Sequence, residues 1–272
     1  MKLILEILAL VVAGYGAWAA ALYLMQRRIL FPRGDAVPDR TAAGVPEMEE
    51  TFVTSRDGVR LLCWFHAPTG AGDTVAYFHG NAGTIEGRGG KARTFLDRGY
   101  GMMLAEYRGY GGNGGRPSET SLVEDAIDAV DALRERGIEP GQVILYGESL
   151  GTAVAAAAAA HLRQRGTPVK AVILEAPFTS IADLASERYP VFPVRALLKD
   201  PFDSMARIAG IGAPLLIVHG TRDRTVPLRH GERLFKQAAE PKRMARLEGA
   251  GHTDVDQFGA VDAMWLFLKG LN

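Results

Sequence analysis

The chain has 272 residues, 47% of them hydrophobic and 23% charged, which is enough for one large domain with a short additional segment. Lysine and arginine together number 31, as do aspartate and glutamate, so the formal net charge is zero. No uniform positive field is available to attract nucleic acid, and we expect no nucleic-acid partner. The single cysteine, Cys63, excludes an intramolecular disulfide and a multi-cysteine zinc site, and the apolar stretch around it predicts a buried packing role.

The first predicted element is an apolar helix over residues 3–25, interrupted by one charged residue, Glu6. At about 1.5 Å per residue, such a helix is long enough to cross a hydrocarbon core about 30 Å thick. Trp18 and Tyr23 lie toward its end and are followed by Gln26-Arg27-Arg28, a combination typical of an interfacial belt and a charged stop. This pattern favours a membrane-spanning helix.

We therefore predict a single-pass membrane anchor at residues 1–28. A cleaved signal peptide is the main alternative, because Ala17-Trp18-Ala19 resembles a small-residue cleavage site. An amphipathic helix packed on the domain is a weaker alternative, since the helix has no polar face. The positive-inside rule compares Lys2 with the arginines that follow the helix, and it favours a cytoplasmic domain. Single anchors of this kind also export the domain that follows, so the side stays open.

Residues 29–48 are predicted to form an extended linker, because prolines and glycines recur there. Strand-like runs follow at 50–55 and 59–67, joined by Arg56-Asp57-Gly58, in which the Asp-Gly pair is a strong hairpin signal. The predicted domain over 49–272 therefore opens with an antiparallel pair.

Beyond residue 74, short apolar runs alternate with helical stretches, which is the pattern of a parallel sheet covered by helices on both faces. The predicted strands cover 75–78, 102–106, 143–146, 171–174, 215–218 and 243–247. The predicted helices cover 88–98, 118–136, 150–163, 228–239 and 255–268. Prolines interrupt the pattern at about 178–212, which we interpret as a small lid. The predicted fold class is α/β, a mostly parallel doubly wound sheet with an antiparallel N-terminal pair, preceded by one transmembrane helix.

Gly147-Glu148-Ser149-Leu150-Gly151 lies between a predicted strand and a predicted helix. This context is what a nucleophile elbow requires, and glycines on both sides of the serine remove Cβ atoms where a sharp turn is crowded. The alternative is an ordinary glycine-rich turn in which Ser149 caps the helix. We predict that Ser149 is a nucleophile.

A serine hydroxyl is a poor nucleophile unless a base takes its proton and a carboxylate orients that base. Asp223 follows the strand predicted at 215–218, and His252 follows the strand predicted at 243–247. Both therefore face the same edge of the sheet as Ser149, in the chain order serine, acid, histidine. The structural alternatives are an ion pair of Asp223 with a neighbouring arginine and a helix-capping role for His252. We predict Ser149, His252 and Asp223 as a catalytic triad.

Five nearby residues receive structural interpretations. Asp254 and Asp256 are reserve acids that we expect to cap the closing helix. His219 is expected to be a hydrogen-bonded buried histidine. His79 is expected to shape its loop, and Glu148 either tunes the turn at Ser149 or is structural.

A tetrahedral intermediate also needs two donors for its oxyanion. One is predicted to be the backbone N–H of Leu150, directly after the nucleophile. The other is expected from the loop His79-Gly80-Asn81-Ala82-Gly83, where small residues allow close approach to substrate, and we favour the N–H of Asn81 over that of Ala82. The histidines and acids lack convincing metal spacing, and the glycine-rich stretch at 107–112 lacks a phosphate-binding pattern, so we predict no metal and no cofactor.

Several segments, in order along nearly the whole chain, resemble the serine-aminopeptidase-like α/β hydrolases, specifically a membrane-anchored branch with an HGNAG loop. The segments are 26–32, 79–83, 107–111, 147–151, 177–180, 219–227 and 251–252. The resemblance implies a triad at Ser149, Asp223 and His252 and an activity on acyl groups, without fixing the substrate. The loop 111–115 departs from the pattern, since glycines and an asparagine replace the expected serine-containing version.

The predicted function is hydrolysis of an acyl ester, thioester or amide bond through an acyl-enzyme. The expected partners are a small-molecule or lipid-like acyl substrate and the membrane. One alternative is a catalytically silent scaffold with the same fold. Another is an aminopeptidase, for which Glu187, Asp183 and Glu148 are candidate carboxylates for a charged amino terminus. The oligomeric state stays open.

Overall fold

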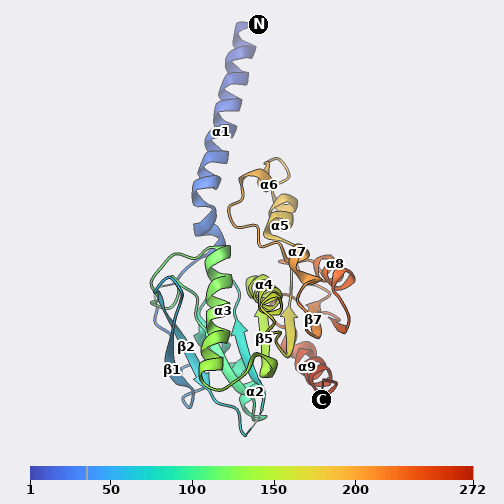
Figure 1. Ribbon diagram of the computed structural model, residues 1–272. Coiled ribbons are helices and arrows are strands. Elements are labelled where there is room, and N and C mark those ends of the chain that lie inside the picture. The colour runs from blue at the N-terminus through green and yellow to red at the C-terminus, as the bar shows by residue number, and fades with distance from the viewer. Residues whose placement is uncertain (35, 71, 272) are drawn as a thin grey trace.

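The computed structural model describes residues 1–34, 36–70 and 72–271, and shows one long helix projecting from an α/β domain (Figure 1). Residue 35 of the predicted linker and residues 71 and 272 of the predicted domain lie outside the described residues. The projecting helix, α1, covers Lys2–Leu30, and none of its residues is buried. It is long and apolar enough to span a membrane, a property that it shares with signal sequences.

The domain is built on an eight-stranded sheet with the order β1-β2-β4-β3-β5-β6-β7-β8. Its strands are β1 (Glu49–Thr54), β2 (Arg60–His66), β3 (Thr74–Phe78), β4 (Gly101–Ala105), β5 (Val143–Glu148), β6 (Ala171–Glu175), β7 (Leu215–Gly220) and β8 (Lys242–Leu247). β2 runs antiparallel to both β1 and β4, and the other neighbours pair in parallel. The prediction of a mostly parallel sheet with an antiparallel N-terminal pair is confirmed.

Helices cover both faces of this sheet (Figure 1). One face packs against α2 (Gly89–Leu96) and α9 (Ala260–Lys269), and the other against α3 (Glu119–Glu135), α4 (Leu150–Gln164) and α8 (Arg229–Gln237). Successive side chains of a strand point to opposite faces, and β3 shows the consequence. Val75 and Tyr77 enter the core beneath α2 and α9, while Ala76 and Phe78 enter the core beneath α3 and α4. Strands buried on both faces explain the continuous apolar runs in the sequence.

Helix α4 is held close to its neighbours. It carries six consecutive alanines at 155–160, and all are buried. Alanine has the highest helix propensity and no bulk beyond Cβ, so this helix packs tightly against β5 and α3. The N-terminus of α4, where Ser149 lies, is thus fixed by the core.

Two predicted helices differ from the structure in detail. The helix predicted at 88–98 is preceded by a 3₁₀ turn, η1 (Ile85–Arg88), and ends at Leu96. The closing helix predicted at 255–268 is broken into η3 (Val255–Phe258) and α9. Gly259 separates them with φ 90°, a left-handed conformation that glycine adopts readily and that interrupts a helix. A further 3₁₀ turn, η2 (Pro140–Gln142), leads into β5.

The segment between α1 and β1 differs from the predicted extended linker. It contains a turn at 40–44, and three of its apolar residues, Phe31, Val45 and Met48, are buried against the domain, while Val37 is exposed. Helix α2 fits closely beneath it, since a Cβ added at Gly89 would lie 1.9 Å from the Ala43 carbonyl oxygen. Prolines and glycines correctly indicate irregular structure, but the apolar residues among them hold this segment on the surface of the domain.

The segment predicted as a lid contains three short helices: α5 (Ile181–Arg188), α6 (Val194–Leu197) and α7 (Ser204–Ile208). The second half belongs to the core, because Phe202, Ile208 and Ile211 are buried there. The first half is more exposed and lies beside α1 (Figure 1). We therefore restrict the name lid to residues 181–199.

Cys63 lies on β2 and is buried. Burial raises the pKa of its thiol to about 12, because a thiolate is poorly solvated in an apolar core. The packing role predicted for this residue is consistent with its position.

Candidate active site

The predicted site residues gather where the strand order reverses. From β3 the chain continues to β4 on one side, and β5 lies on the other side. The carboxyl ends of β3 and β5 therefore flank a crevice of the kind in which open α/β sheets bind ligands. The loop 79–83 leaves β3 at this point, and Ser149 leaves β5.

Ser149 lies on a strained turn between β5 and α4, with φ 50° and ψ −112°. A non-glycine residue rarely adopts positive φ, so the surroundings must hold it there. Its backbone N–H donates a hydrogen bond of 2.9 Å to the Glu175 carbonyl oxygen. A Cβ added at Gly147 would lie 2.3 Å from the Gly151 carbonyl oxygen, and one added at Gly151 would lie 2.0 Å from that of Phe78. The two flanking glycines are therefore a steric requirement of this turn.

We expect Gly151→Ala to lower the free energy of unfolding by about 1–3 kcal/mol or more, because the new methyl group meets backbone that has no room to move. Chemical denaturation followed by circular dichroism measures the loss. Gly141→Ala is the matched control, since a Cβ added at Gly141 meets nothing within 4 Å and its effect should stay within about 0.5 kcal/mol. A Gly151→Ala protein as stable as the wild type would contradict the steric argument.

Ser149, His252 and Asp223 come together in one chain of contacts. The His252 Nε2 atom lies 3.0 Å from Ser149 Oγ, and His252 Nδ1 lies 2.6 Å from Asp223 Oδ2. An ionised carboxylate only accepts hydrogen bonds, so Nδ1 donates to Asp223 and Nε2 is free to accept from the serine hydroxyl. The arrangement is able to move a proton from Ser149 to His252.

Asp223 is buried and firmly held. Its Oδ1 atom accepts hydrogen bonds of 2.8 Å from the backbone N–H groups of Thr225 and Val226. Burial alone raises the pKa of this carboxyl, but the nearby His219 ring and the hydrogen bonds from His252 and the Val226 N–H outweigh burial and hold the pKa well below its usual range. Asp223 is consequently ionised at neutral pH.

His219 is buried behind Asp223, with Nε2 2.8 Å from the Val226 carbonyl oxygen and 3.6 Å from Asp223 Oδ2. The expected buried histidine is present, but its Nδ1 atom has no hydrogen-bond partner among the described residues, so it is only half satisfied.

The two reserve acids, Asp254 and Asp256, do not cap the closing helix as expected. Asp254 Oδ1 instead accepts a hydrogen bond of 2.6 Å from the Gly251 N–H, directly before His252. Asp256 lies 2.5 Å from the Lys91 ammonium group. Both carboxylates bind donors other than the helix N–H groups, and both fix the loop that carries His252.

Glu148 joins the turn at Ser149 to the loop 79–83. Its carboxylate accepts two hydrogen bonds from Arg88, of 2.8 and 3.1 Å, and one of 2.6 Å from the Tyr77 hydroxyl. Burial raises the pKa of this carboxyl, but Arg88 and the Tyr77 hydroxyl lower it by more. The net pKa therefore lies below the usual value of a glutamate. Arg88 also donates to the Ala82 carbonyl oxygen at 3.3 Å. Glu148 is therefore a structural link.

The loop 79–83 is also held from below. The buried His79 ring lies 2.9 Å from Glu106, and the Tyr107 hydroxyl donates to the His79 carbonyl oxygen at 2.8 Å. The Tyr110 hydroxyl donates to the Asn81 carbonyl oxygen at 2.9 Å. A Cβ added at Gly80 would lie 3.5 Å from Ser149 Cβ, so the loop passes directly beside the serine.

The loop 111–115 is well fixed by Asn113, although its sequence departs from the family pattern. The Asn113 side chain accepts from the Leu62 N–H at 2.9 Å and donates to the carbonyl oxygens of Glu106 and Tyr107 at 3.2 Å. One asparagine thus anchors a loop that otherwise consists of glycines.

Lys91 is a contributor to the site that the sequence did not reveal. Its buried ammonium group lies 3.0 Å from Glu175 and 2.5 Å from Asp256. The Glu175 backbone holds the Ser149 N–H, and Asp256 follows His252 by four residues. Lys91 therefore connects Glu175, which binds the Ser149 N–H, to Asp256, which lies on the segment after His252.

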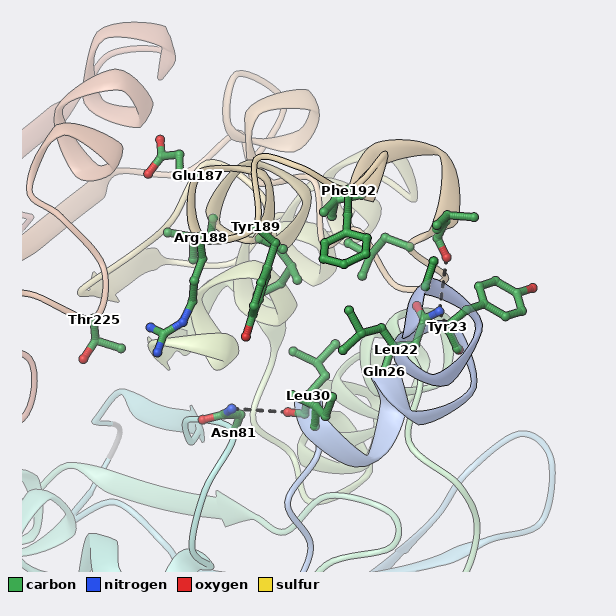
Figure 2. Close-up of a pocket in the computed structure, with 18 of the residues that line it drawn as sticks. Leu22, Tyr23, Gln26, Leu30, Asn81, Glu187, Arg188, Tyr189, Phe192 and Thr225 are labelled. Atoms are coloured by element: carbon green, nitrogen blue, oxygen red, sulfur yellow. Dashed lines mark hydrogen bonds between the residues drawn. The ribbon is translucent and has the colours of Figure 1, made fainter. Parts of the chain in front are cut away.

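Beside these residues, a cavity of about 590 Å³ lies between α1 and the lid. Its walls are mostly apolar, with Leu22 and Leu30 on α1 and Leu184 and Phe192 on the lid. Asn81 and Thr225 border it on the side away from Phe192 of the lid (Figure 2). Ser149 and His252 do not line it, but two of its lining residues are neighbours of the predicted triad: Asn81 follows Gly80, which passes beside Ser149, and the Thr225 N–H donates to Asp223.

Comparison with known proteins gives relatives and structural neighbours. Residues 71–199 match the family model described as serine aminopeptidase, S33. The sequence is 38% identical to an uncharacterised protein of Mycobacterium tuberculosis, over 97% of this chain and 94% of the other. It is 36% identical to alpha/beta hydrolase domain-containing protein 17B of Xenopus tropicalis, over 77% of this chain and 71% of the other. An esterase structure from Pyrococcus furiosus superimposes with a TM-score of 0.71 and 16% identity, over 88% of this chain and 97% of its own.

The sheet order, the helices on both faces and the sharp turn after β5 define an α/β-hydrolase fold, and the solved structures share it, which confirms the predicted fold class. The chain belongs to the α/β-hydrolase family. Its placement in a membrane-anchored branch with an HGNAG loop stays a prediction from the residues.

Proposed function

We propose that the protein is a serine hydrolase that cleaves carboxylic ester or thioester bonds, with Ser149 as nucleophile, His252 as base and Asp223 as the orienting acid. The hydrogen-bonded chain from Asp223 through His252 to Ser149 carries this proposal. The strained conformation of Ser149 is consistent with this role, because residues with strained backbone cluster at active sites.

In the first half-reaction, Ser149 Oγ attacks the carbonyl carbon while its proton passes to His252 Nε2. The bond from the carbonyl carbon to the leaving oxygen or sulfur then breaks, and the leaving group takes the proton from His252. In the second half-reaction, water attacks the acyl-enzyme, His252 removes a proton from the water, and Ser149 is released with that proton. The ionised Asp223 stabilises the imidazolium that forms in both halves.

The negative charge that develops on the carbonyl oxygen needs donors held in advance. Leu150 is the first residue of α4, and the first N–H groups of a helix have no partner within it. Asn81 lies on the loop beside Ser149 and is held through its carbonyl oxygen by Tyr110. We assign the oxyanion site to the N–H groups of Leu150 and Asn81.

An ester or thioester is favoured over the amino terminus of a peptide. An aminopeptidase needs a carboxylate that is available to a charged amino group, and the three candidates already have partners. Glu148 is paired with Arg88, Asp183 with Arg195, and Glu187 with Arg229. A silent scaffold, the other alternative, gives no reason for the strained serine or for the hydrogen bond between Ser149 and His252.

Helix α1 supports attachment of this enzyme to a membrane. It is apolar over nearly its whole length and unburied, and Arg27 and Arg28 follow the apolar part. We propose that it is a single-pass anchor, which brings the site close to lipids.

Reaction with an alkyl fluorophosphonate tests the nucleophile directly. The expected product carries phosphorus on Ser149 Oγ, with fluoride as the leaving group, and mass spectrometry of the digested protein locates it. Heat-denatured protein is the control and should not react, since the folded site activates the serine. Native protein that stays unlabelled would support the scaffold instead.

A further inference from the structure

One face of α1 turns toward the lid. Within the helix, the residues that are partly covered are Ala19, Leu22, Gln26 and Leu30. Their spacing of three or four residues places them along a single helical face. All four border the cavity beside the proposed active site, so the helix forms one wall of it.

Specific contacts keep α1 and the lid together. The Tyr15 ring stacks on Phe192 with centroids 5.2 Å apart, and the Tyr15 hydroxyl donates to the Val191 carbonyl oxygen at 2.9 Å. Closer to the domain, Gln26 donates to the Leu197 carbonyl oxygen at 3.1 Å. The end of α1 is also tied to the loop beside Ser149, because the Asn81 amide donates to the Leu30 carbonyl oxygen at 3.2 Å (Figure 2).

The length of α1 determines the depth of the lid in a membrane. A helix of 29 residues measures about 43 Å, whereas a hydrocarbon core is about 30 Å thick. Wherever the core falls along the helix, the middle of the helix, where Tyr15 lies, is inside it. The lid residues that contact Tyr15 are therefore at hydrocarbon depth. Val191 fits this environment, since it is apolar and 71% exposed.

The cavity then extends from hydrocarbon depth to the proposed active site. Figure 2 shows Phe192 and Tyr189 of the lid facing Leu22 of α1 across it, with Asn81 at its inner end. Arg188 points from the lid toward this inner end (Figure 2) and has no ion pair among the described residues. The cavity is thus mostly apolar between α1 and the lid, where Gln26 is a polar exception, and polar where the reacting group would lie.

We infer that this cavity binds the long acyl chain of a membrane lipid ester, with the membrane helix α1 as one wall of the acyl site and the lid as the other. The inference rests on the proposed hydrolase function and adds a substrate class and a second role for the anchor. The ester group lies beside Asn81 and Ser149, and the chain extends between Leu22 and Leu184 toward the bilayer. Helix α1 therefore determines which acyl lengths are accepted.

The test uses the full-length protein in phosphatidylcholine vesicles, with p-nitrophenyl palmitate and p-nitrophenyl acetate as substrates. The measured quantity is the ratio of the two kcat/KM values. Leu22→Trp fills the cavity from the α1 side and is expected to lower the palmitate-to-acetate ratio about tenfold or more. Leu22→Ala leaves the space open and should keep palmitate as a good substrate.

Leu24→Trp is the matched control, because Leu24 lies on the same helix, is 75% exposed and does not border the cavity. It should leave the ratio at the wild-type value. An unchanged ratio in Leu22→Trp, or an equal fall in Leu24→Trp, would overturn the acyl-site assignment. A wild-type protein that hydrolyses neither ester would contradict the proposed function instead. The failure of the acyl-site assignment and the failure of the proposed function are therefore distinguishable.

A second measurement needs no substitution near the cavity. A hexadecyl fluorophosphonate with a diazirine at the end of its chain reacts with Ser149, and light then attaches the chain end to whatever it contacts. Attachment within 15–30 or 181–199 is the expected result. Attachment confined to other parts of the chain would overturn the inference.

Discussion

Ser149→Ala is expected to lower kcat for ester hydrolysis by roughly a million-fold, because the serine and histidine act as a unit and removal of one disables both. The remaining Asn81 and Leu150 N–H groups would still polarise a bound ester, so a residual rate above that in water should persist. Hydrolysis of p-nitrophenyl butyrate, followed by absorbance with purified full-length protein, measures the loss. Since the substituted alanine would have to adopt the same positive φ, circular dichroism should accompany the assay.

Ser186→Ala provides a matched comparison. The Ser186 hydroxyl donates to the Ala182 carbonyl oxygen within α5 and contacts no residue of the proposed triad. It should keep wild-type turnover. Activity of Ser149→Ala within tenfold of the wild type, with the fold intact, would mean that another group performs the attack.

The three residues of the candidate site can be predicted from the sequence because the patterns that indicate them are local. Each of Ser149, Asp223 and His252 lies within a few residues after the end of a strand, and parallel strands end at a common edge. The glycines around Ser149 add a second local signal, whose steric basis is visible in the short distances from Gly151 to the backbone. Order along the chain and position after a strand together suffice to bring the three side chains together.

The buried ion pairs that hold the site in place could not be predicted from local patterns. Arg88 reaches Glu148 across 60 residues, and Lys91 reaches Glu175 across 84 residues. A lone arginine or lysine in an amphipathic segment is indistinguishable from one in solvent until the fold brings its partner close. The turns at 40–44 and at Gly259 escape prediction for a related reason, since burial and left-handed φ depend on the packed structure.

The pairing of α1 with the lid is equally hidden. Helical periodicity reveals a packed face only when the opposite face is polar, and α1 is apolar on all sides. Tyr15 and Val191 are 176 residues apart, with no local pattern that relates them. The anchor can be recognised from the sequence, but its contribution to the cavity requires the three-dimensional arrangement.

Asp223→Asn should lower kcat by about 10⁴-fold while leaving the fold intact. The asparagine oxygen can still accept from the Thr225 and Val226 N–H groups, so its NH₂ group would face His252 Nδ1. That nitrogen would then have to accept a hydrogen bond, which puts the imidazole proton on Nε2 and removes the base from Ser149. The assay is single-turnover ester hydrolysis at neutral pH, where the depressed pKa of Asp223 keeps the wild-type carboxylate ionised.

Asp254→Asn separates this electrostatic role from simple support of the loop. The Asp254 side chain accepts from the Gly251 N–H, and an amide oxygen can do the same, so only a small loss of activity is expected. If Asp254→Asn were the more damaging substitution, the reserve acid would replace Asp223 as the partner of His252. If Asp223→Asn is the more damaging substitution, the requirement for a negative charge is specific to Asp223, whose Oδ2 atom lies 2.6 Å from the His252 imidazole.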